Sequence, residues 1–262
     1  HLGTVMGIGD HTDVALKDQR DGHDFVPAAF AAGAAAALVS ETYARRPGDG
    51  ALIRVADPLE GLRGIARAAR ARLAPSAKVI AVTGSAGKTT TKEMLRAAFA
   101  TCGKVHAADK SFNNHWGVPL TLARMPADTQ FAIFEIGMNH AGEITPLTGL
   151  VRPHVAIVTN VLPVHVGNFP DGEIGVANAK AEIFAGLEPG GVAIVLRDSP
   201  HFERLKASAE AAGARVRTFG RSRSDDVAIV SGVPATSPNA GFQEVTAKID
   251  GGEEISYRLF IA

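Results

Sequence analysis

A short apolar run followed at once by a glycine-rich turn constrains the fold of this chain more than any other stretch. Residues 79–82 read Val-Ile-Ala-Val, and residues 83–90 read Thr-Gly-Ser-Ala-Gly-Lys-Thr-Thr. An apolar run of this length beside turn residues is typical of a buried parallel strand. Residues 88–102 then carry apolar side chains at helical spacing. The stretch therefore predicts a strand, a glycine-rich loop and a helix in immediate succession.

A strand, a glycine-rich loop and a helix in this order form the setting of a phosphate-binding loop, or P-loop. Glycines let backbone N–H groups turn toward a polyphosphate, and the helix N-terminus adds the positive end of its dipole. Lys88 can reach the β- and γ-phosphates, and the hydroxyl of Thr89 can ligate Mg²⁺. The chain matches the pattern G-x-x-x-x-G-K-[ST] except at position 82, where the pattern requires glycine and the chain has Val82. An ordinary turn with a solvated lysine is the alternative, but loop, lysine, hydroxyl and flanking elements all favour a P-loop.

The composition fits a globular protein with a sizeable core. The 262 residues suffice for one large or two ordinary domains, and 46% of them are hydrophobic. Lys+Arg and Asp+Glu both number 27, so the net charge is zero. This balance argues against an extended basic face, and we expect no nucleic-acid partner.

The single cysteine and the absence of long apolar runs bear on the compartment. Cys102 cannot form a disulfide within the chain, which fits a reducing cytosol, and we expect it to be a buried apolar residue. No apolar run approaches the length of a membrane span, and no signal peptide is visible. We therefore expect a cytoplasmic protein without membrane insertion.

Structural signals divide the chain near residue 76. The residues before it predict a small α/β unit, and residues 74–77 are typical of a linker. The expected elements are strands at 14–16, 34–39 and 52–55, a helix over 25–33 with Asp24 as N-cap, and a helix from Pro58 to about Leu73 with Asp57 as N-cap. We expect an N-terminal domain over residues 1–76 and a central domain over residues 77–262.

From Lys78 on, apolar strands alternate with helices, which predicts a mostly parallel, doubly wound sheet. The expected strands are 79–83, 131–135, 155–159, 192–196 and 215–219, and the expected helices are 88–102, 118–124, 143–151, 173–187 and 199–212. After Val227 the pattern predicts antiparallel strands at 227–232, 242–249 and 254–261, with a hairpin turn at 250–252. The fold class is α/β: a small α/β N-terminal domain, then a P-loop NTPase-type sheet with an antiparallel C-terminal portion.

Polar residues after the predicted strands are candidates for binding, because ligands of open parallel sheets lie beyond the carboxyl ends of the strands. Glu135 ends one apolar run and could hold Mg²⁺ or its water, or could be a hydrogen-bonded structural acid. Asn160 and then His165 follow the next run. The imidazole could ligate a metal or contact phosphate, or could be a loop histidine without a role.

Three further positions stay open on the residues alone. Lys180 lies on an amphipathic helix, where a lysine is ordinarily a solvated surface charge. The loop 111–119 is polar and aromatic. It could recognise a polar ligand, or it could be an ordinary Asn-rich turn with a packed Trp. Asp198 could meet a ribose hydroxyl or belong to a helix N-cap region with Ser199.

Taken in order, these motifs resemble those of the Mur ligases. They are Thr83-Gly-Ser-Ala-Gly-Lys-Thr-Thr90, Asn113-Asn114-x-x-Gly117-x-Pro119, Glu135-Ile-Gly-Met-Asn139 with Gly142-Glu143-Ile144, Thr159-Asn160, His165, and Ala179-Lys180-Ala181-Glu182-Ile183. The block that starts at Glu135 resembles the family members that add D-alanyl-D-alanine. Residues 15–17 and 21–25 are similar to the uridine-nucleotide domain of these ligases, so the resemblance covers nearly the whole chain.

The resemblance implies amide formation driven by ATP, with Mg²⁺ as the metal. The implied partners are UDP-N-acetylmuramoyl-tripeptide and D-alanyl-D-alanine. The γ-phosphoryl group would pass to the C-terminal carboxylate of the tripeptide, and the amine of D-alanyl-D-alanine would attack the resulting acyl phosphate. We expect a monomer that acts in the synthesis of peptidoglycan precursors.

The resemblance also assigns roles to individual residues. Lys88 is implied to bind phosphate, and Lys180 matches a lysine that is carbamylated in many Mur ligases, which turns a cation into an anionic metal ligand. His165 matches a histidine near a second metal ion. The catalytic set is thus Lys88, His165 and Lys180, and the metal set is Thr89, Glu135, His165 and Lys180. The nucleotide set is Thr83, Gly84, Ser85, Ala86, Gly87, Lys88, Thr89, Thr90 and Asn160, and the substrate set is Asn113, Asn114 and His23.

The ends of the chain shape one more expectation. Residues 1–12 do not match the start of the family well, and the sequence stops where the central domain should finish. We therefore expect the third, C-terminal ligase domain to be absent, MgATP binding to be weak, and ligation by these residues alone to be impaired or absent. The alternatives are another Mur-type amino-acid ligase, a non-catalytic nucleotide- or UDP-sugar-binding fragment, and a general P-loop ATPase. The Glu135 block and Lys180 argue against the last.

Overall fold

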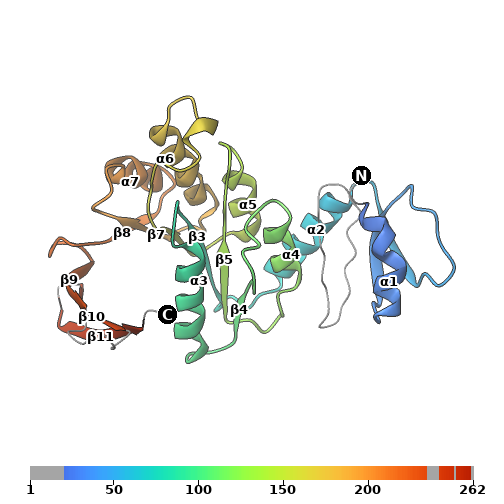
Figure 1. Ribbon diagram of the computed structural model, residues 1–262. Helices are drawn as coiled ribbons and strands as arrows, with labels where there is room; N and C mark the ends of the chain where they lie inside the picture. The colour runs from blue at the N-terminus through green and yellow to red at the C-terminus, as the bar shows by residue number, and fades with distance from the viewer. Residues whose placement is uncertain (1–20, 235–241, 251, 261–262) are drawn as a thin grey trace. The chain divides into compact units, whose positions relative to one another are not determined.

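A computed structural model describes residues 21–234, 242–250 and 252–260, which form two compact units (Figure 1). The first unit holds the described residues up to Arg72 together with Pro119–Met125. The second holds Leu73–Val118 and the residues from Pro126 on. The strand expected at 14–16, the resemblance at residues 15–17 and the poorly matching residues 1–12 lie outside the described residues.

The first unit contains two parallel strands, with a 3₁₀ turn and a helix before them and a longer helix after them. Its elements are a 3₁₀ turn Gly22–Phe25, α1 Val26–Ala31, β1 Ala36–Ser40, β2 Ala51–Val55 and α2 Pro58–Ala71. Asp57 caps α2 by accepting from the N–H of Leu59 at 2.8 Å, as expected for an Asp-Pro start. The N-cap expected at Asp24 is wrong, because Asp21 caps the 3₁₀ turn by accepting from the N–H of His23 and Asp24 lies inside that turn.

A segment far along the sequence completes the first unit. Helix α4 spans Gly117–Ala123, and Pro119–Met125 belongs to the first unit although we assigned it to the central domain. The guanidinium of Arg72, at the end of α2, donates to the carbonyl of Met125. Leu122 and Met125 are fully buried. Burial of these side chains explains why the segment joins this unit.

The second unit is built on one nine-stranded sheet in the order β11-β10-β9-β8-β7-β6-β3-β5-β4 (Figure 1). The run from β4 to β9 is parallel, and β9, β10 and β11 pair antiparallel, so the predicted fold class is confirmed. The strands are β3 Lys78–Thr83, β4 Val105–Ala107, β5 Phe131–Glu135, β6 Val155–Val158, β7 Val192–Leu196, β8 Arg215–Gly220, β9 Val227–Pro234, β10 Phe242–Ile249 and β11 Glu254–Phe260. The sequence analysis missed β4, which is too short for a strand pattern.

Helices cover both faces of the parallel part of the sheet. The helices are α3 Lys88–Ala100, α5 Ile144–Val151, α6 Glu173–Ala181 and α7 Phe202–Ala211. Leu95 and Phe99 of α3 pack on the core cluster that contains Ile80 and Val82 of β3. The alternate residues Val79 and Ala81 are also fully buried, so both faces of β3 are covered, as in other doubly wound sheets. The loops beyond the strand ends are therefore held by a rigid core.

Two predicted helices differ from the structure. The helix expected over 173–187 ends at Ala181 and continues as a 3₁₀ turn, Glu182–Gly186. The turn tightens against α5, where the hydroxyl of Thr148 donates to the carbonyl of Ile183 at 2.8 Å. The helix expected from residue 199 begins at Phe202, since Ser199 forms a turn by accepting from the N–H of His201.

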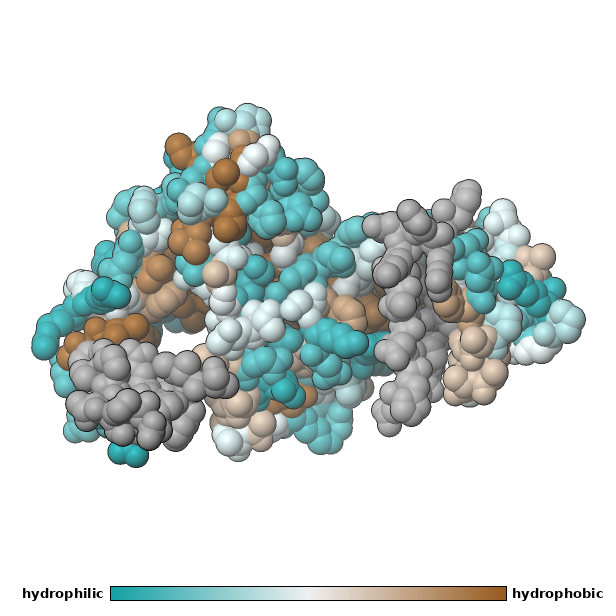
Figure 2. All heavy atoms as spheres, viewed as in Figure 1, coloured by the Kyte–Doolittle hydropathy of each residue, from teal (hydrophilic) through white to brown (hydrophobic). Residues whose placement is uncertain are grey.

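The surface is mostly polar with local apolar groups. In Figure 2 apolar side chains gather at the top of the view, around α6 and the loop before it, where Leu162, Val164, Val166 and Ile174 are exposed. Cys102 is exposed, which corrects the expectation that it is buried. Among the described helices, none combines the length and the apolar character that crossing a membrane requires.

Candidate functional site

The glycine-rich loop turns sharply between the end of β3 and the start of α3. Gly84 has φ +150° and Gly87 has φ +79°. A Cβ at Gly84 would lie 1.8 Å from Oγ1 of Thr159, so position 84 admits only glycine. A Cβ at Gly87 would meet nothing within 4 Å, so the loop borders open space at that point. The backbone is thus shaped as a P-loop requires, with room beside it for a phosphate group.

The loop is fixed from the end of β6 by Thr159 and Asn160. Oδ1 of Asn160 accepts from the N–H of Ala86 at 2.9 Å, and the backbone carbonyl of Asn160 accepts from the N–H of Ser85 at 3.1 Å. The hydroxyl of Thr159 donates to the carbonyl of Ala86 at 2.7 Å. The predicted nucleotide residue Asn160 therefore lies against the loop. On the other side the buried hydroxyl of Thr83 has no hydrogen-bond partner among the described residues.

Lys88 is the first residue of α3 and lies back over the loop. Its ammonium donates to the carbonyl of Gly84 at 2.8 Å. Burial lowers the pKa of Lys88, and the negative charge of Glu135 acts in the opposite direction. The ammonium is thus held at the loop by one neutral acceptor, in a place where a phosphate oxygen can take over that bond.

Thr89 and Glu135, which come from α3 and from the end of β5, meet directly. The hydroxyl of Thr89 donates to Oε2 of Glu135 at 2.9 Å, and Nδ2 of Asn113 donates to Oε1 at 2.7 Å. The hydroxyl of Ser111 lies 3.1 Å from that of Thr89. Glu135 is 3% exposed. The structure therefore brings Thr89, Glu135 and Asn113 together, as their predicted roles require.

The donor set at Glu135 fits a magnesium ion that also binds phosphate. Mg²⁺ is ordinarily held by one or two carboxylates and a hydroxyl, with phosphates and waters completing its shell. Neutral donors occupy both oxygens of Glu135, and such donors can turn away when a cation binds. Within the described residues no three His, Cys, Asp or Glu side chains cluster. Thr89 and Glu135 would hold the ion, and the nucleotide would supply oxygen ligands.

Lys180 is buried on α6 rather than exposed, although a helical lysine taken alone predicts a surface charge. Only 3% of the residue is accessible. Burial, and secondly the charge of Lys88, lower the pKa of Lys180 from 10.5 to about 8. The charge of Lys88 therefore acts on Lys180, as expected for lysines that lie near one another. A lysine held this way has a substantial neutral fraction near neutral pH.

The other predicted residues are not joined to this group. His165 is exposed with φ +60°, and in the described part of the chain no hydrogen bond or ion pair links its imidazole to Glu135 or Lys180. Thr90 is exposed on α3. Asn114 accepts from the N–H groups of Trp116 and Gly117 through Oδ1, which caps the start of α4.

His23, a predicted substrate residue, is 7% exposed in the first unit. Its Nδ1 lies 2.7 Å from Oδ1 of Asp21, and its Nε2 accepts from the N–H of Ser40 at 3.0 Å. The ring stacks on Tyr43 with centroids 5.1 Å apart. Both nitrogens are thus used inside the unit, and a role of His23 in substrate binding stays a prediction.

Asp198, after β7, hydrogen-bonds to the backbone of the loop after β8. Oδ2 of Asp198 accepts from the N–H of Arg221 at 3.0 Å. A Cβ at Gly220 would lie 3.1 Å from this oxygen, so the carboxylate is packed against the end of β8. Asp198 thus has a structural contact at the end of β8, but the expected N-cap region is wrong, because α7 begins at Phe202 and has no side-chain cap among the described residues.

Glu182 is a functional candidate that the sequence analysis did not single out. Its carboxylate accepts from the N–H of Gly142 at 2.6 Å and from those of Ile144 and Thr145 at 3.1 Å each. These groups start α5, so Glu182 caps that helix from another segment. Glu182 follows Lys180 by two residues, and the capped turn follows the loop after Glu135. The signal was present, since both motifs contain these residues, but only the fold shows that they meet.

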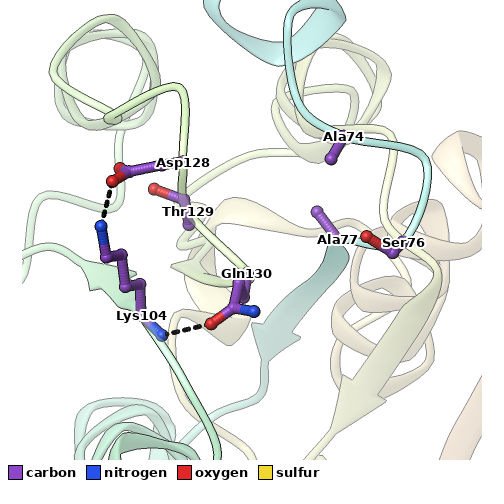
Figure 3. A pocket seen from close by; sticks show the side chains of 7 residues that line it. All are labelled: Ala74, Ser76, Ala77, Lys104, Asp128, Thr129 and Gln130. Atoms are coloured by element: carbon purple, nitrogen blue, oxygen red, sulfur yellow. Dashed lines mark hydrogen bonds and ion pairs between the residues drawn. The ribbon is translucent and has the colours of Figure 1, made fainter.

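A separate cavity of about 360 Å³ lies at the amino ends of the strands, whereas the P-loop lies at their carboxyl ends (Figure 3). Its lining residues all precede the starts of β3, β4 and β5: Ala74, Ser76, Ala77, Lys104, Asp128, Thr129 and Gln130. The P-loop follows the carboxyl end of β3, so the cavity is one strand length away, roughly 20 Å. The charged side chains of this cavity, Lys104 and Asp128, are exposed and pair with each other. It is therefore distinct from the candidate site.

Comparison with known proteins places this geometry in a family context. Residues 82–258, more than half of the chain, match the Mur ligase middle domain. The chain is 40% identical over 214 residues to the UDP-N-acetylmuramoyl-tripeptide–D-alanyl-D-alanine ligase of Bacillus subtilis (strain 168), covering 81% of the chain and 45% of that protein. The enzyme of the same name from Escherichia coli (strain K12) is 42% identical over 188 residues, with 71% and 40% covered.

A solved structure agrees with these sequence matches. A crystal structure of MurF from Acinetobacter baumannii superposes with a TM-score of 0.79 at 30% identity, covering 94% of the chain and 51% of that protein. The chain thus spans less than half the length of the two curated relatives described above and about half of this solved structure.

Proposed function

This chain belongs to the Mur ligase family. From that premise we propose that it forms part of an ATP-dependent ligase that joins D-alanyl-D-alanine to UDP-N-acetylmuramoyl-tripeptide. The observation that carries the proposal is the meeting of Lys88, Thr89 and Glu135 around the P-loop, with Lys180 buried beside them. Transfer of a phosphoryl group needs positioning and charge neutralisation more than covalent chemistry, and these side chains supply both.

Each side chain has a part in the proposed reaction. ATP with Mg²⁺ supplies the phosphoryl group that activates the tripeptide carboxylate as an acyl phosphate. Lys88 would exchange its bond to the Gly84 carbonyl for a phosphate oxygen and offset the charge that develops during transfer. Thr89 and Glu135, whose side chains meet, would hold the metal. Asn113, whose Nδ2 lies 2.7 Å from Oε1 of Glu135, would approach the carboxylate substrate.

Lys180 has the properties that carbamylation requires. A neutral amine attacks CO₂, forms an N–C bond and loses a proton, and the pKa of about 8 leaves part of the side chain neutral at pH 7.5. The product is an anion close to the Lys88 ammonium, and this charge pair supports a carbamate over a protonated lysine there. His165 would then have to approach from its exposed position to act near a second metal ion.

We place this reaction in the cytoplasm, with a monomer as the acting species and no nucleic acid involved. The lone cysteine supports a reducing compartment, and the equal numbers of acidic and basic residues support a small charged substrate over a polyanion.

Trapping the acyl phosphate tests carboxylate activation without the amine substrate. The chain is incubated with MgATP, UDP-N-acetylmuramoyl-tripeptide and hydroxylamine, which captures an acyl phosphate as a hydroxamate that mass spectrometry detects. We expect hydroxamate from the native chain and none from Lys88→Ala. Nucleotide binding without tripeptide-dependent hydroxamate would contradict activation by this chain and favour a nucleotide-binding fragment.

A second incubation, with D-alanyl-D-alanine in place of hydroxylamine, tests the complete ligation. The pentapeptide product is expected if the amine is also bound. Hydroxamate without pentapeptide would limit the chain to the activating step, and product with another amino acid would assign a different Mur-type specificity.

A further inference from the structure

Lys92 is a completely buried lysine on α3 that the proposed reaction does not use. Its accessible fraction is 0%, and it is the largest fully buried side chain in the described residues. An isolated ammonium removed from water costs several kcal/mol unless close partners compensate. A lysine in the fourth position after Lys88 on an amphipathic helix would ordinarily face solvent. Its burial therefore calls for a structural account.

The ammonium of Lys92 contacts the backbone of the chain segment after β4. Nζ donates to the carbonyl of Ala108 at 2.5 Å, and the carbonyl of Lys110 lies at 3.5 Å. The neighbouring carboxylate of Glu93 lies 3.0 Å away and balances the charge. Two of these three acceptors belong to the backbone of residues 108–110, so the lysine fastens that backbone to α3.

The same segment is fastened to α3 a second time, one helical turn earlier. Residues three apart on a helix are neighbours on its surface, which places Thr89 beside Lys92. The hydroxyl of Thr89 lies 3.1 Å from that of Ser111. Residues 108–111 thus run along α3 between two fixed points.

Beyond Ser111 the segment reaches the end of β5. The side chain of Asn113 donates to Oε1 of Glu135 at 2.7 Å, and the backbone carbonyl of Asn113 accepts from the N–H of Gly137 at 2.8 Å. A Cβ at Gly137 would lie 3.0 Å from the Asn113 side chain, so the fit between the two is close. The segment that Lys92 contacts at residues 108–110 thus continues directly into the residues that contact the candidate metal ligands.

We propose that Lys92 is a positioning residue for the magnesium site: its ammonium holds residues 108–113 so that Ser111 and Asn113 orient the Thr89 hydroxyl and the Glu135 carboxylate. The inference rests on the proposed function, in which Thr89 and Glu135 hold Mg²⁺. Lys92 itself touches neither metal nor nucleotide. A methionine would fill the same space but would leave the Ala108 carbonyl without its donor.

The test compares ATP affinity with Mg²⁺ and with EDTA, measured by calorimetry on the native chain and on Lys92→Met. Lys206→Met, on α7, is the matched control, because it removes a partly exposed lysine that pairs with the exposed carboxylate of Glu210. Partners behind metal ligands typically change metal affinity by about 10- to 100-fold. We expect Lys92→Met to reduce the gain in ATP affinity on adding Mg²⁺ by about tenfold, with the affinity in EDTA nearly unchanged. The control should match the native chain in both buffers.

A conservative variant separates positioning from simple loss of stability. Lys92→Gln keeps an N–H donor near the Ala108 carbonyl, so it should recover part of the Mg²⁺ effect, and it decides the question alone if Lys92→Met does not fold. An unchanged Mg²⁺ effect in a folded variant would overturn the inference, as would equal losses with Mg²⁺ and with EDTA. If the native chain itself binds ATP no better with Mg²⁺, the proposed function fails instead.

Discussion

The carboxyl ends of the parallel strands, here called the carboxyl edge, and their amino ends, the amino edge, are both polar. The two edges hold their charges in different ways. At the carboxyl edge, Glu135 and Lys180 are each 3% exposed, and donors from two other segments reach the oxygens of Glu135. At the amino edge, Lys104 and Asp128 form an ion pair whose side chains are 68% and 62% exposed (Figure 3). A cavity of about 360 Å³ lies beside this exposed pair.

The two edges differ in how their charges are compensated. Removing a charge from water is costly, so a fold that keeps one buried must compensate it with specific partners. Shifted pKa values follow from that burial, and they cluster where chemistry occurs. An exposed ion pair beside a cavity needs no such support, because water already solvates both groups.

The largest expected effect is that of Lys88→Ala at the carboxyl edge. The variant loses the charge-assisted bonds to phosphate, each of which contributes about 1.5–3 kcal/mol. We expect ATP affinity, measured by calorimetry in the presence of Mg²⁺, to fall about 100-fold. An affinity within threefold of the native value would mean that the buried charges at this edge serve the fold and not the nucleotide.

The pH dependence of stability at Lys180 provides the next largest effect. Its pKa of about 8 in the folded chain lies below the ordinary 10.5, so the unfolded chain binds more protons between these values. Stability should therefore rise with pH above about 8, and by pH 9.5 Lys180 should have added about 2 kcal/mol relative to pH 7. Urea unfolding of the native chain and of Lys180→Met at both pH values measures the difference, which should vanish in the variant. A parallel rise in both proteins would show that Lys180 is not desolvated.

A smaller effect is expected for Glu182→Gln, which tests the contacts that link the two motif blocks. The substitution keeps the shape but removes the charge that faces the first N–H groups of α5. We expect a loss of about 1 kcal/mol of unfolding free energy, the usual scale for a helix cap. Glu41→Gln, at an exposed position, is the control and should change little. Equal losses in the two variants would remove any special role for this carboxylate.

The smallest effect belongs to the amino edge, where Lys104→Met breaks the ion pair with Asp128. Exposed pairs contribute about 0–1 kcal/mol, and we expect a change below about 0.5 kcal/mol. ATP affinity should equal that of the native chain. A clear loss of nucleotide binding would contradict the contrast between the edges more directly than any other result.

Much of the site could be predicted because local sequence specifies it. The P-loop requires glycines with positive φ, a lysine and a hydroxyl in one continuous stretch, and Glu135 follows a strand whose apolar run is plain in the sequence. The burial of Lys180 could not be found this way, because the helix pattern alone places it on the surface. Its position depends on α6 packing beside the loop, which only the tertiary fold determines.

Elements that depend on distant contacts were the ones missed. Strand β4 has three residues, and its pairing with β5 defines it more than its own pattern does. The end of α6 at Ala181 depends on the packing of the following turn against α5. Lys92 gives no local signal, because the carbonyls that it binds lie 16 and 18 residues further along the chain.

The return of Pro119–Met125 to the first unit has a consequence for synthesis on the ribosome. Domains ordinarily fold as they emerge, with the N-terminal one first. Here the carbonyl that Arg72 binds belongs to Met125, so it is made only after the P-loop, α3 and β4 have been synthesised. The first unit therefore completes its packing while the second is already partly synthesised, and the two must fold in an interleaved order.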